Sequence, residues 1–333
     1  MSDDRTGRSG EDTLIARYFR PLATDPGAFG LVDDAAVLAS CDEDVVVTTD
    51  AIVEGVHFFA DDPPDTVARK ALRVNLSDLA AKGARAAGFV LTLALRAADD
   101  AWLSRFARAL GEDARALDCP LLGGDTVSTP GPLMISITAF GRVPADTMVR
   151  RSGAEAGDRL FVTGTIGDAA LGLAVLRGDA VAGALADAPA LREAVVARYR
   201  VPEIRLAVAE AVRQHAHAAM DISDGLAGDL AKLCAASGVS AQVRVDAVPV
   251  SEAGRRVLLR GAAGLETILA GGDDYEVLCA VPANRCDGFA EAARAAGIAV
   301  TGIGTVTAGT APPVFLDANG AAIALSRLSY SHF

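Results

Sequence analysis

The sequence predicts a mixed α/β or α+β fold built as two halves of similar size. Short apolar runs of strand length alternate with longer segments of helical periodicity along the 333 residues. A polar segment rich in Pro and Gly interrupts this pattern near the middle, and each side of it carries a group of aspartates. A chain of this length usually forms two domains or one large α/β unit.

Strands are expected where short runs rich in β-branched and apolar residues lie between turn residues. These runs cover residues 45–50, 88–95, 133–143, 159–163, 241–247, 276–281 and 298–306. Helices are expected between them, as in 66–82, where Leu72, Leu76 and Leu79 recur on one helical face. The same periodicity is found in 99–117, 203–215, 225–236 and 286–296. This alternation is typical of α/β and α+β proteins and not of a repeat protein.

The boundary between the halves is expected near residues 144–158, where apolar periodicity lapses and Pro, Gly and charged residues collect. Residues 1–10 are polar and lack the apolar core of a signal peptide, so we expect a disordered tail there. The chain then divides into an N-terminal domain, residues 11–148, and a C-terminal α/β domain, residues 149–333.

Composition and charge exclude several classes of protein. The formal net charge of -12 argues against nucleic acid as a partner, because it leaves no basic stripe for a phosphate backbone. No apolar run approaches the roughly 20 residues of a membrane helix. The five cysteines are odd in number and lack C-x-x-C spacing, which predicts reduced thiols in a cytoplasmic protein. Such an acidic protein needs a cation to bring in an anionic ligand.

Aspartates placed where apolar runs end are the most informative feature. Asp50 ends one expected strand, Asp125 follows two glycines, and Asp78 has apolar neighbours within an expected helix. The remaining candidates are Asp33, Asp34, Asp221, Asp224, Asp273 and Asp274. Buried carboxylates are unfavourable unless they are paired or bind a metal. Hard oxygen ligands suit Mg²⁺ or Ca²⁺, and Mg²⁺ usually binds a few carboxylates together with phosphates.

The simpler interpretation of each aspartate is a helix cap or a turn, and Asp224-Gly225 and Asp125 are examples. For a single aspartate that interpretation is favoured, whereas the set as a whole favours a metal site. Other chemistries lack their motifs, since neither a P-loop, a dinucleotide-binding G-x-G-x-x-G, H-E-x-x-H nor G-x-S-x-G is present. His57, close after Asp50, fits a structural role and a cleft residue equally well.

At these positions the sequence resembles the thiamine-monophosphate kinase family. The resemblance runs in family order through nearly the whole chain. It rests on TLIARYF (13–19), DDAAVL (33–38), TTDAIVEGVHF (48–58), KALRVNLSDLAAKGA (70–84), LLGGDT (121–126), RSGAEAGD (151–158), VTGTIGDAALGL (162–173), DISDGLAGDL (221–230), GGDDYE (271–276) and YSHF (330–333). This set is far more specific than any one motif.

The resemblance implies the two-domain fold of aminoimidazole ribonucleotide synthetase, with N-terminal and C-terminal α/β halves. It assigns ATP and Mg²⁺ binding and dimerisation to residues 11–148, and it implies a homodimer. The implied reaction transfers the γ-phosphoryl group of ATP to thiamine monophosphate, giving thiamine diphosphate and ADP. Several Mg²⁺ ions are implied, ATP is the co-substrate, and a requirement for K⁺ stays open.

The same resemblance assigns roles by motif. The implied Mg²⁺ ligands are Asp34, Thr48, Thr49, Asp50, Asp78, Asp125, Asp221 and Asp224. The implied ATP contacts are Gly124, Asp125, Arg151 and Ser223. The thiamine phosphate would meet His57, Asp273 and Tyr330. Among these, Asp50, Asp125, Arg151 and Asp221 are expected to be catalytic.

Three positions depart from the family pattern: Val32 stands where Gly is usual, Asp273 where Glu is usual, and Lys82 where Met is frequent. Two alternatives stay open. One is another ATP-dependent synthetase of the superfamily, although the Cys-Lys expected of selenophosphate synthetase does not occur in the first 40 residues. The other is a catalytically silent nucleotide-binding protein, which predicts loss of aspartates that are all present here.

Overall fold

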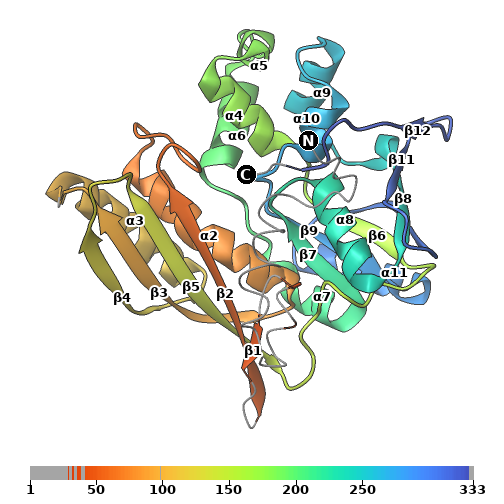
Figure 1. Ribbon diagram of the computed structural model, residues 1–333, viewed down its shortest axis with the longest axis horizontal. Coiled ribbons are helices and arrows are strands. Elements are labelled where there is room, and N and C mark those ends of the chain that lie inside the picture. The colour runs from red at the N-terminus through yellow and green to blue at the C-terminus, as the bar shows by residue number, and fades with distance from the viewer. Residues whose placement is uncertain (1–28, 30–31, 34–35, 39–41, 98, 330–333) are drawn as a thin grey trace, which may run out of the picture.

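The computed structural model describes residues 29, 32–33, 36–38, 42–97 and 99–329. They form two sheets side by side, each with its own helices (Figure 1), which confirms the predicted α/β class. The expected tail 1–10 and the expected site residues Asp34 and Tyr330 lie outside these residues.

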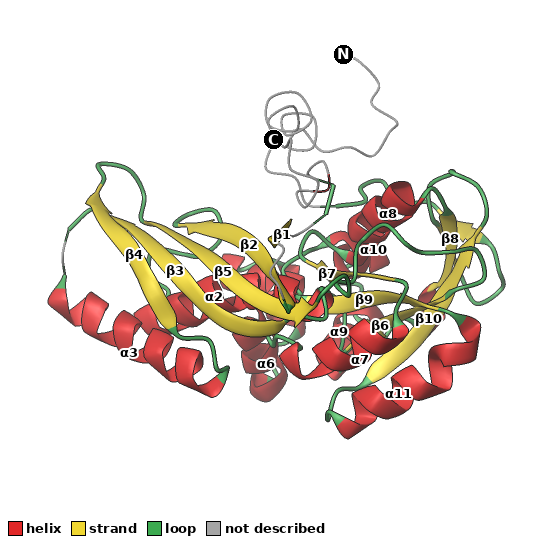
Figure 2. Ribbon diagram, turned by 90° about the horizontal axis from the view of Figure 1, so that it is seen from below, coloured by secondary structure: helices red, strands yellow, loops and turns green. Residues whose placement is uncertain are grey.

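The first sheet contains β1 (Ala36–Leu38), β2 (Glu43–Val53), β3 (Arg85–Leu95), β4 (Leu121–Ser128) and β5 (Met134–Pro144). Their spatial order is β1-β2-β5-β3-β4, and every neighbouring pair is antiparallel except β3–β4. The helices α2 (Pro64–Ala81) and α3 (Asp100–Ala116) lie along one face of this sheet (Figure 2). At the start of α3, the Asp99 carboxylate accepts hydrogen bonds from the backbone N–H of Ala101 and Trp102.

The second sheet has the order β12-β11-β8-β10-β6-β9-β7. Its strands are β6 (Arg159–Thr163), β7 (Ala218–Ile222), β8 (Ser240–Arg244), β9 (Glu276–Val281), β10 (Val300–Thr307), β11 (Val314–Leu316) and β12 (Ala322–Ile323). Its helices are α4 (Asp168–Arg177), α5 (Ala180–Ala184), α6 (Pro189–Arg200), α7 (Ala209–His215), α8 (Leu226–Ser237), α9 (Glu252–Leu259), α10 (Leu265–Ala270) and α11 (Cys286–Ala295).

Helices cover both faces of the central strands of the second sheet. In β9, Leu278 packs in the core cluster that α4 and α8 share, whereas Val277 and Cys279 pack in the cluster with α7 and α11. A strand buried on both faces has a continuous apolar sequence, as β9 does after its first residue, and the expected ranges for β6 and β9 match the structure to the residue.

Helix α2 lies between the two sheets and connects them. It packs on β2 and β5 of the first sheet and on β7 and β9 of the second. Almost all of it from Val67 onward is buried, including the polar residues Lys70, Asn75, Ser77 and Asp78. Polar side chains of α2 are therefore delivered to the junction between the halves.

The structure differs from the sequence expectations at several points. Residues 203–208 do not belong to an α-helix: 206–208 form a 3₁₀ turn, and α7 begins at Ala209. The alternative that Asp125 caps a helix is wrong, because Asp125 lies within β4, and neither β4 nor β7 is among the expected strands. Among the described helices, none is long and apolar enough to cross a membrane.

Candidate active site

Carboxylates from both halves converge at the junction between the two sheets. Asp50 comes from β2, Asp78 from α2 and Asp221 from β7, and we call these three residues the carboxylate cluster. They line a cavity of about 210 Å³ together with Thr48, Thr49, Ser223 and Tyr275. Three elements distant in the sequence therefore supply one acidic cavity.

Local hydrogen bonds orient the cluster. Thr48 lies two residues before Asp50, hence on the same face of β2, and its hydroxyl donates to the Asp78 carboxylate. The backbone N–H of Asp50 donates to Asn75 Oδ1 at 2.9 Å. Thr49 points to the opposite face, where its hydroxyl donates to the Ile137 carbonyl at 3.1 Å. Thr48 is thus the threonine whose hydroxyl joins the cluster.

Ionising all three carboxylates of the cluster without a bound cation is electrostatically unfavourable. Burial, together with the charges of Asp221 and Asp50, raises the pKa of Asp78 well above its usual range. Burial likewise raises the pKa of Asp221 to about 6. Lys82 opposes both shifts: it is fully buried, its ammonium lies 2.7 Å from Asp33 Oδ1, and it donates to the Ala219 carbonyl. One lysine offsets part of this charge.

Asp224 lies just past the cluster, beside a lysine. Its carboxylate pairs with Lys232, which also reaches Asp229 Oδ1 at 3.2 Å, and the backbone N–H of Asp224 donates to Asp229. Burial raises the pKa of Asp229, and the charges of Lys232 and Arg151 oppose this shift. The backbone N–H of Arg151 donates to Asp33 Oδ2 at 2.8 Å. Arg151 is therefore close to the segment that precedes Asp34.

A second pocket adjoins the acidic cavity. It has a volume of about 200 Å³ and shares Asp50, Ser223 and Tyr275 with the cavity. We call it the acceptor pocket. Its other lining residues are Ala51, Ile52, Val56, His57, Val74, Leu173, Arg177, Tyr199, Asp224, Gly271, Gly272 and Asp273. The shared residues mean that molecules in the two pockets would meet beside Asp50.

The loop that carries Asp273 is held in a rare backbone conformation. Asp273 and Tyr275 have φ angles of 65° and 53°, in the left-handed region that non-glycine residues seldom adopt. Their backbone N–H groups donate to the carbonyls of Ser223 and Ile222 at 2.7 and 2.8 Å. Such conformations persist where the surroundings hold them, frequently at functional sites. Asp tolerates this region better than most residues, which suits the Asp at position 273.

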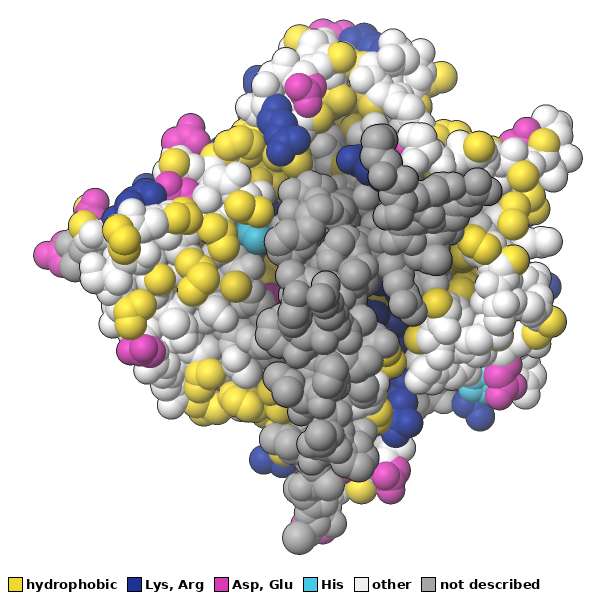
Figure 3. Space-filling view, viewed as in Figure 1, with side chains coloured by type: hydrophobic (Ala, Val, Ile, Leu, Met, Phe, Trp, Pro, Cys, Tyr) yellow, Lys and Arg dark blue, Asp and Glu magenta, His cyan; other side chains and the backbone are white. Residues whose placement is uncertain are grey.

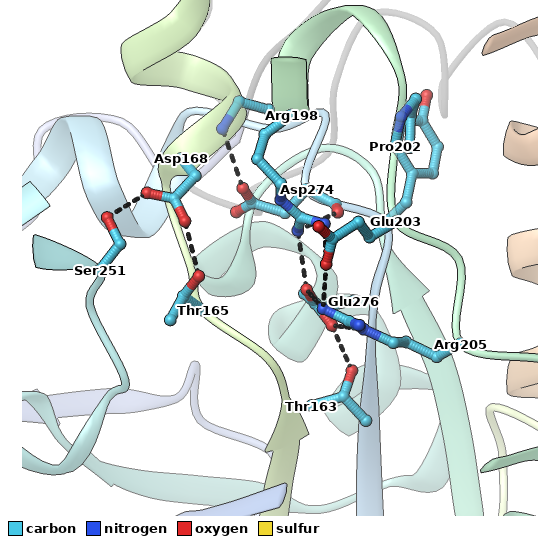
Figure 4. Close-up of polar contacts among 12 residues, drawn as sticks. Thr163, Thr165, Asp168, Arg198, Pro202, Glu203, Arg205, Ser251, Asp274 and Glu276 are labelled. Carbon is cyan, nitrogen blue, oxygen red and sulfur yellow. Dashed lines mark hydrogen bonds and ion pairs between the residues drawn. The ribbon is translucent and has the colours of Figure 1, made fainter. Parts of the chain in front are cut away.

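A buried ion network supports the same loop from below (Figure 4). Glu276, fully buried at the start of β9, accepts from Arg198, from Arg205 and from the Thr163 hydroxyl, each within 2.7 Å. Arg198 also donates to the Asp274 carbonyl at 3.2 Å. Removing one partner of such a network would leave a buried charge uncompensated.

Gly124 and Asp125 do not reach the carboxylate cluster of their own chain. Both lie on the edge strand β4, and β3 and β5 separate it from β2. With neighbouring strands about 4.8 Å apart, Asp125 is about 14 Å from the Asp50 strand. The pairings Asp125–Thr92, Thr92–Ser136 and Ser136–Ala51 put Asp125 on the face of Ala51, opposite to Asp50. A Cβ on Gly124 would overlap the Leu91 carbonyl, so strand pairing alone requires this glycine.

Several residues that shape the site had escaped sequence reasoning. Lys70, Asn75, Ser77 and Tyr275 are buried polar groups that point into the junction, and Tyr199 lines the acceptor pocket. The signal was present in α2, where Lys, Asn and Ser fall on the apolar face of a helix. In the described part of the chain, no three His, Cys, Asp or Glu side chains are already arranged to hold a metal ion.

The two sheets and the acidic junction define a class, the AIR synthase related proteins. Residues 32–143 match the family described as AIR synthase related protein, N-terminal domain, and residues 155–317 match its C-terminal domain. The chain is 44% identical to the thiamine-monophosphate kinase of Caulobacter vibrioides over 96% of this chain and 89% of that protein. It therefore belongs to the thiamine-monophosphate kinase family.

Solved structures agree with this assignment. The crystal structure of thiamine-monophosphate kinase from Stenotrophomonas maltophilia is similar with a TM-score of 0.76 and 38% identity, covering 91% of this chain and 94% of that one. The structure of AaThiL complexed with AMPPCP and TMP is similar with a TM-score of 0.78 and 28% identity, covering 92% and 97%.

Proposed function

We propose that this protein transfers the γ-phosphoryl group of ATP to thiamine monophosphate, giving thiamine diphosphate and ADP, with Mg²⁺ bound at the carboxylate cluster. The observation that carries the proposal is the junction of two pockets, one acidic and one lined by His57 and Asp273, which share Asp50, Ser223 and Tyr275. The related AaThiL was crystallised with AMPPCP, a nucleotide, and TMP together. Two anionic ligands would meet at this junction.

The donors at the cluster suit Mg²⁺. They are carboxylates and a threonine hydroxyl, the hard oxygen ligands that this ion prefers. Burial disfavours the ionised form of Asp78, and a bound cation would stabilise that form. We assign the ion to Asp50, Asp78, Asp221 and Thr48, with Asp224 and Asp34 as further ligands and Asp125 supplied by a second copy of the chain. Thr49 lines the cavity, but its hydroxyl faces the other side of β2, so we do not assign it as a ligand through that group. Bound there, Mg²⁺ would neutralise phosphate charge and stabilise the transferring group.

The chemistry needs little from the protein beyond positioning and charge neutralisation. A phosphate monoester with a second pKa near 6 is already largely ionised at neutral pH, so no general base is required. In the proposed direct transfer, an oxygen of the acceptor phosphate attacks the γ-phosphorus in line. The bond from that phosphorus to the β,γ-bridging oxygen breaks, and ADP leaves. Gly124, Ser223 and Arg151 would hold ATP, with the Arg151 guanidinium countering charge. His57, Asp273 and Tyr330 would hold the acceptor.

A homodimer would explain the position of Asp125. The strand β4 exposes Leu121, Leu122 and Val127, which are 54%, 60% and 44% accessible. Hydrophobic side chains are spread over the face of the molecule formed by the first sheet (Figure 3). Pairing of two such faces would bury them and bring Gly124 and Asp125 of each chain to the partner. We propose this dimer, in the cytoplasm, as the working form.

The direct test incubates the protein with ATP, Mg²⁺ and thiamine monophosphate and measures thiamine diphosphate and ADP. We expect both in equal amounts, and neither when EDTA is in excess. Thiamine without its phosphate serves as the control acceptor and should give no product, because it lacks the ionised nucleophile. ADP formation without thiamine diphosphate would contradict the proposal and favour another superfamily reaction. Thiamine diphosphate formed at the same rate in EDTA would exclude the proposed role of Mg²⁺.

A further inference from the structure

A single buried lysine holds three walls of the acceptor pocket. Lys70 lies on α2 and is 1% accessible. Its ammonium donates to the His57 carbonyl at 2.9 Å and to Asp273 Oδ2 at 3.0 Å, and it lies 4.0 Å from the centre of the Tyr199 ring. An ammonium has three N–H groups, so these neighbours account for its full capacity. Lys70 itself does not line the pocket, whereas all three of its neighbours do.

These three walls come from separate parts of the chain. His57 follows β2, Tyr199 lies in the last turn of α6, and Asp273 is in the loop before β9. The Tyr199 hydroxyl also donates to the His57 carbonyl, at 3.2 Å, which closes the group into a ring of contacts. An N-terminal helix thus joins an N-terminal loop to two C-terminal segments.

Hydrogen bonds to both carboxylate oxygens fix the orientation of Asp273. The Lys70 ammonium donates to Oδ2, and the Tyr275 hydroxyl donates to Oδ1 at 3.2 Å. Further along the same face of α2, about two turns from Lys70, the Ser77 hydroxyl donates to the Tyr275 carbonyl at 3.4 Å. Helix α2 therefore contacts both residues of this loop that have left-handed backbone conformations, Asp273 and Tyr275.

We propose that Lys70 is the positioning residue of the acceptor pocket: it fixes His57, Tyr199 and Asp273 in the arrangement that binds the phosphorylated acceptor. This inference rests on the proposed function, because it takes that pocket as the acceptor's site. Stability alone is a weak reason for such a lysine, since buried ion pairs are frequently replaceable by apolar residues without loss. Asp273 keeps a quarter of its side chain accessible, so it can be solvated when Lys70 is replaced.

The test is Lys70→Met, which keeps the length of the side chain and removes the charge and the donors. We expect the KM for thiamine monophosphate to rise about tenfold or more, as for loss of hydrogen bonds to a charged group, while the KM for ATP changes by less than about twofold. Calorimetry with thiamine monophosphate, without ATP, should show the same loss of affinity. Arg96→Met is the matched control, because it removes a cation paired with Glu54 outside the acceptor pocket, and it should leave both KM values unchanged.

A double-mutant cycle with Asp273→Asn separates positioning from general damage. If Lys70 acts by holding Asp273, the double variant should bind the acceptor no worse than Lys70→Met alone. The double variant removes both charges of the Lys70–Asp273 pair, so no charge is left without its partner. Acceptor binding can therefore be measured on the double variant if Lys70→Met does not fold. Fully additive effects, an unchanged acceptor KM, or an equal rise in the ATP KM would overturn the inference. A wild-type protein that forms no thiamine diphosphate would instead defeat the proposed function, which keeps the two outcomes distinct.

Discussion

Replacing Asp221 by Asn measures how unfavourable the carboxylate cluster is without metal. Burial raises the pKa of Asp221 from 3.8 to about 6, with Asp229 and Asp50 adding to the shift and Ser77 and Lys82 opposing it. Since one pH unit corresponds to about 1.4 kcal/mol, the ionised carboxylate lowers the free energy of unfolding at neutral pH by about 3 kcal/mol. The Asn side chain has nearly the same shape and no charge. The metal-free variant should therefore be more stable than wild type by about 1–3 kcal/mol.

The pH dependence of this gain has a definite sign. The native Asp221 carboxyl keeps its proton up to about pH 6, whereas the unfolded chain releases it near 3.8. In this window the native state binds more protons, so wild type loses this part of its stability as the pH rises. The difference between variant and wild type should be near zero at about pH 4 and complete above about pH 6.

Urea unfolding followed by circular dichroism, in EDTA and across this pH range, gives the difference directly. A parallel series with Mg²⁺ and a non-hydrolysable ATP analogue should stabilise wild type and not the variant. Asp187→Asn is the control, because Arg260 and Arg256 lower the pKa of that exposed carboxyl and the substitution should give no gain. An Asp221→Asn protein that is less stable than wild type at neutral pH, or a difference independent of pH, would refute the reasoning.

Four further predictions concern the rest of the site. Asp78→Asn should abolish phosphoryl transfer while the metal-free melting temperature holds or rises, because burial and two neighbouring carboxylates raise the pKa of Asp78; a large drop in the metal-free melting temperature with turnover retained would show a structural role. Arg151→Ala should raise the KM for ATP with little change in melting temperature, and unfolding of the variant would contradict this. Calorimetry should detect little ATP binding in EDTA, and equal affinity with and without Mg²⁺ would exclude a metal-dependent nucleotide site. Leu121→Asp should shift the protein from dimer to monomer in sedimentation velocity, since it places a charge on the exposed strand β4; a monomeric wild type, or an unchanged dimer, would be evidence against that interface.

Much of the fold was readable because several strands are buried on both faces. The run 276–281 is apolar after its first residue, and the run 159–163 has three apolar residues at its centre; both match β9 and β6 to the residue. Strand β4 was not readable, because LLGGDTVS resembles a turn and its glycine is required by a contact with β3 that is remote in sequence. Strand β7 is as long as β6, but its sequence AAMDI has one β-branched residue and no aromatic residue, so it lacks the composition that indicates a strand.

The sequence indicates which aspartates are candidates for the site, but it does not indicate how they are arranged in space. Asp50, Asp78 and Asp221 line one cavity, because each is a polar residue within or at the end of an otherwise apolar element at the junction of the two sheets. Asp125 does not join them within one chain. Strands β3 and β5 separate it from β2, and the sequence does not reveal which face of the sheet Asp125 occupies after these two pairings. Lys70 was missed because its importance depends on three partners that only the tertiary fold brings together.

The central position of α2 has a consequence for how this chain can vary. Lys70 at the acceptor pocket and Asp78 at the carboxylate cluster are part of one uninterrupted helix, which sets their separation along the axis at about 12 Å. Inserting or deleting one residue between them would shift one group by about 1.5 Å and rotate it by about 100° around the axis. Substitutions in this stretch can be compensated by neighbours, but a change of length cannot. We therefore expect working relatives to differ here in residue type and never in residue number.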